Sequence, residues 1–267
     1  MIGALYRTMI KTNGKLMLYM GLGSFVIMAA YVALFPTIAN QNMDQLLKSM
    51  PEGLLKAFNL SDGLNTLNGF LVAEFYSMIY LILLIVYSVL TANHLVSRLV
   101  DRGSMAYLIA TPNSRLRVIT TQMLFSLTGL VFISVCIVLG ALVSDAWLID
   151  TSMLEMDRFL QINVIGCLTF AVICAYSFLF SCLFNDERRA LSISASITII
   201  FLILDIVGKV SEDLDWLRNF TLFHAFDPAK ISDGTVKVLP LSIGLAGASI
   251  FLFVLSAIIF KRKDLPI

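Results

Sequence analysis

Residues 70–93 read FLVAEFYSMIYLILLIVYSVLTAN, an apolar run in which Glu74 is the one charged side chain. A helix of about 20 residues crosses the roughly 30 Å hydrocarbon core of a bilayer. Leu, Ile, Val and Phe follow one another here without the alternation of a barrel strand, and within lipid only a helix can satisfy its own backbone amides. The run therefore predicts a transmembrane helix.

Five further segments share this length and composition, and they predict an all-α integral membrane protein. The six predicted spans run approximately from Leu16 to Ile38, Phe70 to Asn93, Met123 to Val143, Leu160 to Phe184, Ala190 to Gly208 and Leu239 to Phe260. The 267 residues are 58% hydrophobic and 14% charged, and the mean hydropathy of +0.88 excludes an ordinary soluble globule. No repeat or Pro/Gly/Ser-rich linker divides the chain, so we predict one domain over residues 1–267.

Basic residues predict the orientation of the spans. Six spans place both ends of the chain on one side, with Arg7, Lys11, Lys15, Arg98, Arg102, Arg115, Arg117, Arg188, Arg189, Lys261, Arg262 and Lys263. The other side holds fewer basic residues, and these are spread among many acids. The positive-inside rule therefore predicts a multi-pass protein of the cytoplasmic membrane with both termini in the cytoplasm.

The residues before the first span, IGALYRTMIKTNGK, have an amphipathic pattern. Ile2, Leu5 and Met9 fall toward one helical face, whereas Arg7 and Lys11 fall mostly toward another. This pattern favours an N-terminal interfacial helix that lies on anionic lipid. The alternative is a charged anchor with no defined structure.

The segment between the second and third spans, residues 94–122, contains turn signals of its own. Asp101 can cap a helix that begins near Arg102, and residues 104–110 can form about two turns before Pro112 ends the helix. Asn113 and Ser114 can cap the next helix, which leads into the third span. Connections between neighbouring helices usually take about two to eight residues, so this length and internal capping favour a docking element over a plain linker.

Catalytic motifs are missing from the sequence. No glycine-rich loop is followed by Lys and Ser or Thr, so the chain should not hydrolyse ATP itself. His94 and His224 fall on opposite sides of the membrane without further ligands at metal spacing. No nucleophile elbow is present. We expect no cofactor or metal on this chain. The expected partners are membrane lipid and other proteins, and not nucleic acid.

Two acids and a row of hydroxyls fall within the predicted spans. Glu74 and Asp205 could contact a substrate or proton, which is the usual suspicion for an intramembrane acid. Both lie near a membrane boundary, however, where a helix dipole can stabilise Glu74 and Lys209 can pair with Asp205. Ser192 and Ser196 form one row on the fifth span, which suits close helix packing or a polar path. These alternatives remain open.

Four fragments resemble a known family. They are the turn Asp101-Arg102-Gly103 with LIATPNSRLR (108–117), PEGLLKAF (51–58), FHAFDPAKI (223–231) and FKRKDLPI (260–267). Together these fragments are similar to the permease subunit of bacterial type-2 ABC exporters. That family has six spans per subunit and a separate ATPase. The resemblance implies that residues 98–110 form a coupling helix in a cleft of the ATPase, with a second contact at residues 185–189. The implied coupling residues are Arg98, Asp101, Arg102, Met105, Tyr107, Leu108, Asp186 and Arg188. The alternative is a solvated loop face.

The resemblance also implies an assembly and a transport activity. Two permease chains would form a homodimer, and this homodimer would bind two separate ATPase subunits. The two permease chains would be identical copies of this chain. ATP and Mg would bind only to the two partner ATPase subunits. A translocation path would lie between the first, second and fifth spans of the two copies.

The expected substrate is amphipathic or hydrophobic, with a membrane-active or antimicrobial peptide as the first hypothesis. Residues that could line the path are Glu74, Tyr76, Tyr80, Ser192, Ser196 and Asp205. The alternative class is an ATP-independent secondary transporter or a membrane scaffold protein. A secondary transporter more often has charges in the middle of its spans or matching broken helices in two halves, and both features are weak here.

Overall fold

The computed structural model describes residues 2–39, 53, 66–110, 114–148 and 154–263, and no strand occurs among them. Six helical segments are long and apolar enough to cross a membrane: Gly3–Ile38, Leu67–Asp101, Arg115–Trp147, Met156–Leu183, Glu187–Val210 and Val238–Arg262. Each contains one of the predicted spans, except that Met156–Leu183 ends one residue before the predicted end at Phe184. The prediction of an all-α protein with six spans is confirmed.

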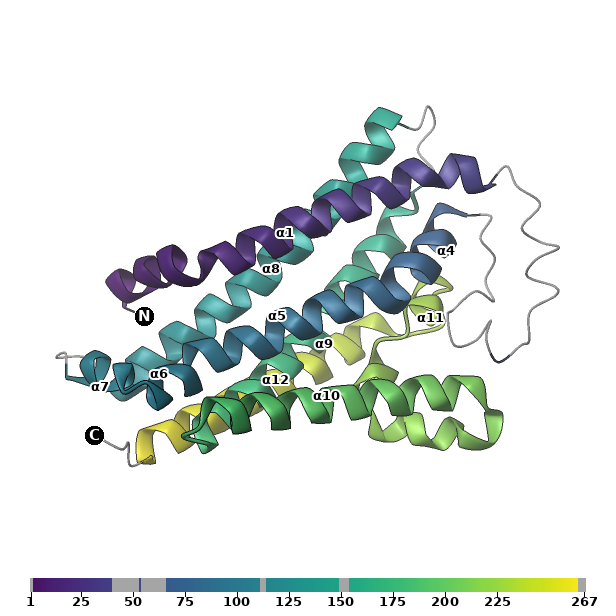
Figure 1. Ribbon diagram of the computed structural model, residues 1–267. Coiled ribbons are helices and arrows are strands. Elements are labelled where there is room, and N and C mark those ends of the chain that lie inside the picture. Colours follow the sequence, from purple (N-terminus) through teal and green to yellow (C-terminus); the bar gives the residue numbers. More distant parts are fainter. Residues whose placement is uncertain (1, 40–52, 54–65, 111–113, 149–153, 264–267) are drawn as a thin grey trace.

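The long helices form two layers (Figure 1). α1 (Gly3–Ala39), α5 (Tyr80–Leu95) and α10 (Glu187–Val210) form the front layer, and α8 (Arg115–Leu148), α9 (Met156–Leu183) and α12 (Val238–Arg262) lie behind it. α9 has the most buried apolar stretch of the six spans. It is therefore the centre of the packing, whereas α1 and α10 present most of their apolar surface to the outside.

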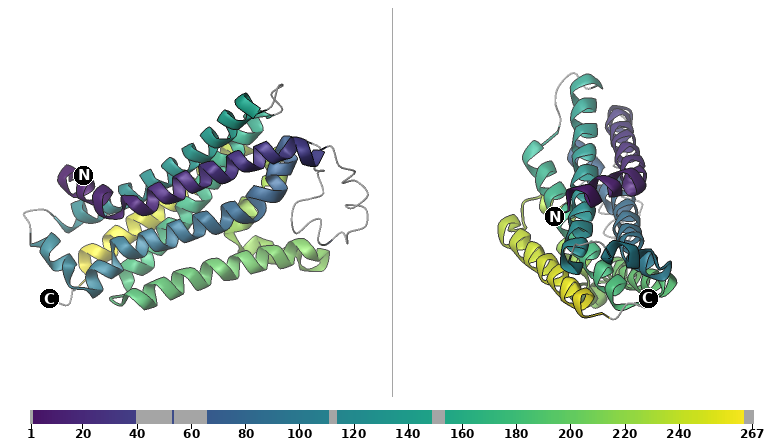
Figure 2. Two further views of the ribbon diagram at one scale, coloured as in Figure 1. Left: turned by 45° about the horizontal axis from the view of Figure 1, so that its top comes forward. Right: turned by 90° about the vertical axis from the view of Figure 1, so that its left-hand side faces the viewer.

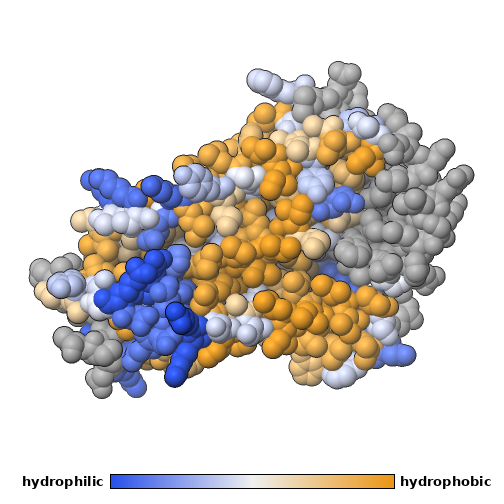
Figure 3. All heavy atoms as spheres, in the orientation of Figure 1, coloured by the Kyte–Doolittle hydropathy of each residue, from blue (hydrophilic) through white to orange (hydrophobic). Residues whose placement is uncertain are grey.

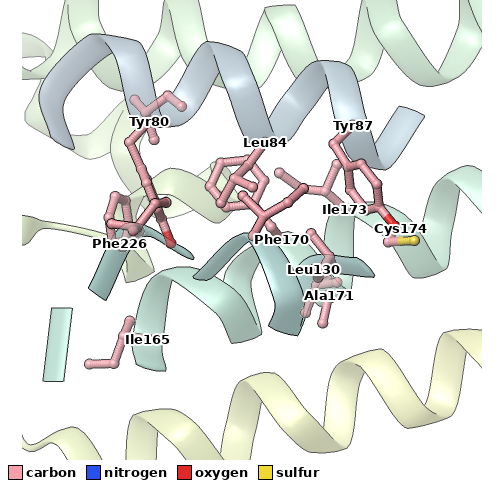
Figure 4. Close-up of a cluster of buried hydrophobic side chains, with 14 of the residues drawn as sticks. Tyr80, Leu84, Tyr87, Leu130, Ile165, Phe170, Ala171, Ile173, Cys174 and Phe226 are labelled. Atoms are coloured by element: carbon pink, nitrogen blue, oxygen red, sulfur yellow. The ribbon is translucent and has the colours of Figure 1, made fainter. Parts of the chain in front are cut away.

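Aromatic side chains fill the contact between α5 and α9 (Figure 4). The Tyr80 ring stacks on Phe226, with 5.4 Å between ring centroids, and meets Phe170 edge-on at 5.7 Å. Such pairs contribute about 0.5–1.5 kcal/mol each beyond the burial of their area. A Cβ at Gly166 would lie 2.2 Å from the Tyr80 hydroxyl, so this close approach requires glycine.

The second span changes its helical geometry along its length. It begins with α4 (Leu67–Leu71), continues as the π-helix η1 (Val72–Ile79) and becomes α5 at Tyr80. The amide of Tyr80 donates to the carbonyl of Phe75, five residues earlier, and the Ser77 hydroxyl donates to the Val72 carbonyl at 2.7 Å. π-Helical turns occur frequently at functional sites. The apolar pattern alone did not predict this one.

The N-terminal residues are helical and continuous with the first span in α1. The first turns nevertheless bend away from the axis of the rest (Figure 2). The amide of Ile2 donates to the Thr121 hydroxyl at 3.0 Å, and the Tyr6 and Thr128 hydroxyls are 2.9 Å apart. The alternative of an unstructured anchor is therefore wrong for the described residues, and these turns are fastened to α8.

The connection between the second and third spans contains two short helices. α6 (Ser97–Asp101) and α7 (Ser104–Ile109) are separated by Arg102 and Gly103. Gly103 has a φ of 70°, in the left-handed region that glycine tolerates. The predicted cap at Asp101 is wrong, because Asp101 ends α6 and Gly103 precedes α7. The predicted cap at Ser114 is confirmed, since its hydroxyl accepts from the Arg117 amide at 3.3 Å.

Two predictions lie outside the described residues. Pro112, the predicted stop, belongs to residues 111–113, and most of the fragment PEGLLKAF belongs to residues 40–65. Beyond α10 the chain forms the 3₁₀ helices η2 (Glu212–Phe220) and η3 (Leu222–Ala225) and the short α11 (Pro228–Ser232) before α12.

Candidate coupling and transport surfaces

One end of the bundle gathers the residues predicted to couple transport to an ATPase. We call it the α7 end: it holds α6, α7, the turn between α9 and α10, and both ends of the chain (Figure 1). Hydrophilic side chains collect at this end, whereas the middle of the same face is apolar (Figure 3). The opposite end, with η2, η3 and α11, we call the α11 end.

α7 is anchored on one side and open on the other. The Met105 side chain is 1% exposed and belongs to the hydrophobic core, whereas Tyr107 is 82% exposed. Asp101 and Arg102, just before α7, are also exposed. The buried Met105 side chain therefore anchors α7 to the core, while the Tyr107 ring and two opposite charges beside it are exposed.

A buried glutamine fastens the junction between the second span and α6. The helix is interrupted at Val96, whose φ of −121° and ψ of −76° are not helical. Gln122 of α8 donates from Nε2 to the Leu95 carbonyl at 2.5 Å, next to this interruption. This bond joins the last residue of α5, just before α6, to α8. The sequence reasoning missed Gln122, although a polar residue beside an apolar run was a signal.

The turn between α9 and α10 lies against α6. Arg98 Nε is 3.8 Å from Glu187 Oε1, so the two segments predicted to contact an ATPase are neighbours. Asp186 accepts from the Arg189 amide at 2.9 Å and caps α10, and Arg188 is exposed. The structure thus brings Arg98 close to the second predicted contact.

The residue after α12 closes this end of the bundle. Lys263 Nζ donates to the Phe184 carbonyl at 2.8 Å, and Arg115 donates to the Lys263 carbonyl at 2.7 Å. Burial lowers the pKa of Lys263, although the charged amine still has a carbonyl acceptor. These bonds join the ends of α8, α9 and α12.

The residues predicted for a translocation path divide into two groups. Tyr76 and Tyr80 are fully buried, and Asn163 donates to the Tyr76 hydroxyl at 2.7 Å. Within one chain they are therefore part of the core. Glu74, Ser192 and Ser196 are exposed on the helix surface. Those three side chains are the ones that a neighbouring molecule could reach.

Asp205 belongs to a buried ion network at the α11 end. Its carboxylate lies 3.1 Å from Lys209 Nζ, which confirms the predicted pair, and 3.2 Å from Arg218 Nε. Arg218 Nη2 also lies 2.9 Å from Asp227 Oδ2. A Cβ at Gly208 would approach Arg218 Cγ to 2.4 Å, so glycine makes room for the arginine. Asp205 therefore has a structural role in this arrangement.

The network shifts the protonation of its members outside the spans. Burial alone would raise the pKa of Asp227, but Lys209, Arg218 and Lys230 outweigh it and hold this pKa below its ordinary value. Burial would lower the pKa of Arg218, yet Asp227 and Asp205 raise it. Burial and the neighbouring cations lower the pKa of His224. The network thus favours its charged carboxylate and guanidinium.

The fold and its polar ends define a multi-pass membrane protein, and the comparison with known families says which kind. The family described as multidrug efflux system permease Rv1217c, C-terminal domain, matches residues 13–261. The chain therefore belongs to this family and is a transporter permease. None of the curated proteins compared with the chain matches it.

Proposed function

We propose that this chain is the membrane-spanning subunit of an ATP-driven exporter and that a separate ATPase docks on α6 and α7. The observation that carries the proposal is the contrast within α7, where Met105 is buried and Tyr107 is 82% exposed. Exposed aromatic residues beside charged ones are frequent anchors of protein interfaces. Such a helix at the end of a transmembrane bundle suits a docking element.

The connections of α6 suggest how a push would travel. The Gln122 bond to the Leu95 carbonyl links the interruption at Val96 to α8. The Arg98–Glu187 contact links α6 to the start of α10. Closure of an ATPase dimer would displace α6 and α7 and, through these contacts, move the second, third and fifth spans together.

A second copy of the chain is proposed to face the front layer. This layer consists of α1, α5 and α10 (Figure 1), the helices of the first, second and fifth spans. On α10 the side chains of Ile199, Ser192 and Ser196 are exposed, which gives this surface both apolar and hydroxyl groups. Two such surfaces in a homodimer would enclose a path with mixed polarity.

The proposed substrate is an amphipathic or hydrophobic compound that moves outward across the cytoplasmic membrane. Membership of a multidrug efflux permease family supports this class. Exposed apolar and hydroxyl side chains on α10 would suit molecules with both characters. The hypothesis of a membrane-active peptide falls within the class and stays a prediction.

The test is to co-express this chain with each candidate ATPase encoded beside its gene, and to purify and reconstitute any complex that forms. Reversing both charges, with Asp101→Arg and Arg102→Glu, should abolish co-purification or lower substrate-stimulated ATP hydrolysis at least about tenfold, as loss of interface charge pairs costs about 2–5 kcal/mol. Lys261→Glu, at the end of α12, is the matched control and should keep both activities. Unchanged coupling in the double variant, or no ATPase in the purified complex, would contradict the proposal.

A further inference from the structure

A groove separates the N-terminal half of α1 from the α5–α7 segment at the α7 end. One cavity of 440 Å³ lies between α1 and α7, and a second of 280 Å³ continues toward the membrane between α1 and α5. Five residues line both: Thr12, Asn13, His94, Leu95 and Arg98. The first volume falls in the range of about 300–1,000 Å³ that is usual for ligand sites. The two cavities form one continuous groove.

The charged lining of this groove is basic. Arg98 and Arg102 line the first cavity, and Lys15 and Arg98 line the second. Neither lining contains an acid; the nearest recorded partner is Glu187, which lies 3.8 Å from Arg98. Cations gathered on facing helices without an acid between them create a positive potential that favours a bound anion.

Both parts of the groove combine cations with apolar side chains. Arg102 and Tyr107 lie at the end farther from the bundle, whereas Leu16, Leu90 and Phe125 line the part that runs along the spans. Thr8 and Thr12 donate to carbonyls of their own helix, which leaves their hydroxyl oxygens as polar lining. A ligand that fits must carry a negative head and an apolar tail.

We propose that this groove binds an anionic phospholipid. The phosphate lies among Lys15, Arg98 and Arg102, and an acyl chain follows Leu16 and Leu90 toward the bilayer. Basic pockets between transmembrane helices on the cytoplasmic side suit lipid head groups. The bound lipid would connect α1 to α6 and so stabilise the position of the segment that carries α7.

The apolar continuation decides between a lipid and a free anion. Inorganic phosphate would use the three cations but would leave the cavity beside Leu90 and Phe125 without an apolar partner. A phospholipid already lies in the surrounding bilayer and uses both parts. Lipid binding in this groove would not require an ATPase partner.

The test measures lipid binding to the purified full chain in a neutral detergent. Native mass spectrometry should show phosphatidylglycerol bound at least about tenfold tighter than phosphatidylcholine. Changing Lys15, Arg98 and Arg102 to Gln should weaken binding roughly 100-fold, since each basic residue near an anionic lipid contributes about 1 kcal/mol. The matched control changes Arg117, Lys261 and Arg262 to Gln, which lie outside the groove, and should stay within about twofold of wild type.

Two further measurements keep the proposal open to refutation. A phosphatidylglycerol with a photoreactive acyl chain should cross-link in wild type to the segment that contains Leu90. Cross-linking elsewhere, equal weakening in both triple variants, or equal binding of the two lipids would overturn the proposal. Displacement of the lipid by an equal concentration of inorganic phosphate would show a free-anion site and would also overturn it.

Discussion

The two ends of the bundle use charged residues in different ways. At the α11 end Arg218 is 7% exposed and lies 2.9–3.2 Å from two buried carboxylates, those of Asp227 and Asp205. At the α7 end Asp101 and Arg102 are exposed, and the Arg98–Glu187 contact is longer, at 3.8 Å. The α11 end therefore uses its charges to hold its own helices together, whereas the α7 end leaves charges accessible to a partner.

The largest effect on stability is expected from the removal of Arg218 at the α11 end. Arg218→Met should lower the free energy of unfolding by about 3–5 kcal/mol, because it leaves buried carboxylates without their partner. Chemical denaturation of the purified protein, followed by circular dichroism, measures the change. Asp215→Asn is the control, since Asp215 is 63% exposed and its loss should cost less than about 1 kcal/mol. Similar stabilities for the two variants would remove the distinction between the ends.

α7 offers a comparison on a smaller scale within one helix. Met105→Ala should destabilise the protein by about 2 kcal/mol, because it leaves a cavity in the core. Tyr107→Ala should change stability by less than about 0.5 kcal/mol, because its side chain is mostly in solvent.

The order of the same two variants should be reversed for ATPase binding, where Tyr107→Ala should have the larger effect. Tyr107→Ala should weaken the ATPase complex by about 2 kcal/mol, or roughly 30-fold, if Tyr107 is an interface anchor. Denaturation and titration with the ATPase give the two values. A Tyr107→Ala variant that binds the ATPase with full affinity would argue against docking through this ring.

A smaller effect is expected for the ion pair at the α7 end. Arg98→Gln should lower stability by less than about 1 kcal/mol, because both side chains of the Arg98–Glu187 pair are partly exposed. The measurement is the same denaturation experiment, with Glu187→Gln as its counterpart. A loss as large as that of Arg218→Met would show that this end, too, depends on its charges for stability.

The six spans were predictable because lipid is a demanding solvent. A bilayer requires long apolar helices that satisfy their own backbone, so length and composition alone locate them. The row of hydroxyls on α10 was also visible, although burial divides it: Ser194 and Thr198 are buried, whereas Ser192 and Ser196 are exposed. Helical periodicity predicts such rows but does not say which row meets another helix.

The remaining features depend on contacts between distant residues. Lys209 could be paired with Asp205 from its spacing. Arg218, however, reaches both Asp205 and Asp227 only after η2 folds back. Tyr80 enters the core because Gly166, on another helix, leaves room for its hydroxyl. No local sequence pattern indicates either of these close contacts. For the same reason the groove beside α6 could not be predicted, since its lining comes from α1 and from the α5–α7 segment.

The smallest expected effect concerns acid at the α11 end. The pKa of Asp227 is lowered in the folded protein, so its contribution to stability is complete above the ordinary value near about 4 and is lost as the pH falls through the lowered pKa. The pKa of His224 is lowered as well, so the fold favours its neutral form. Its contribution is present above about pH 6.5 and is lost as the pH falls below that value.

Thermal unfolding between about pH 7.5 and 3 should therefore show two losses of stability, a slight one below about pH 6.5 and a larger one below about pH 4. His224→Gln should remove the first loss and keep the second, because only the imidazole titrates in the upper window. The Asp227→Asn variant should be less stable than wild type at neutral pH. Its stability should change less with pH below about pH 4, because the side chain at position 227 no longer titrates. If Asp227→Asn kept the wild-type profile in acid, the ion network would not be what gives the α11 end its stability.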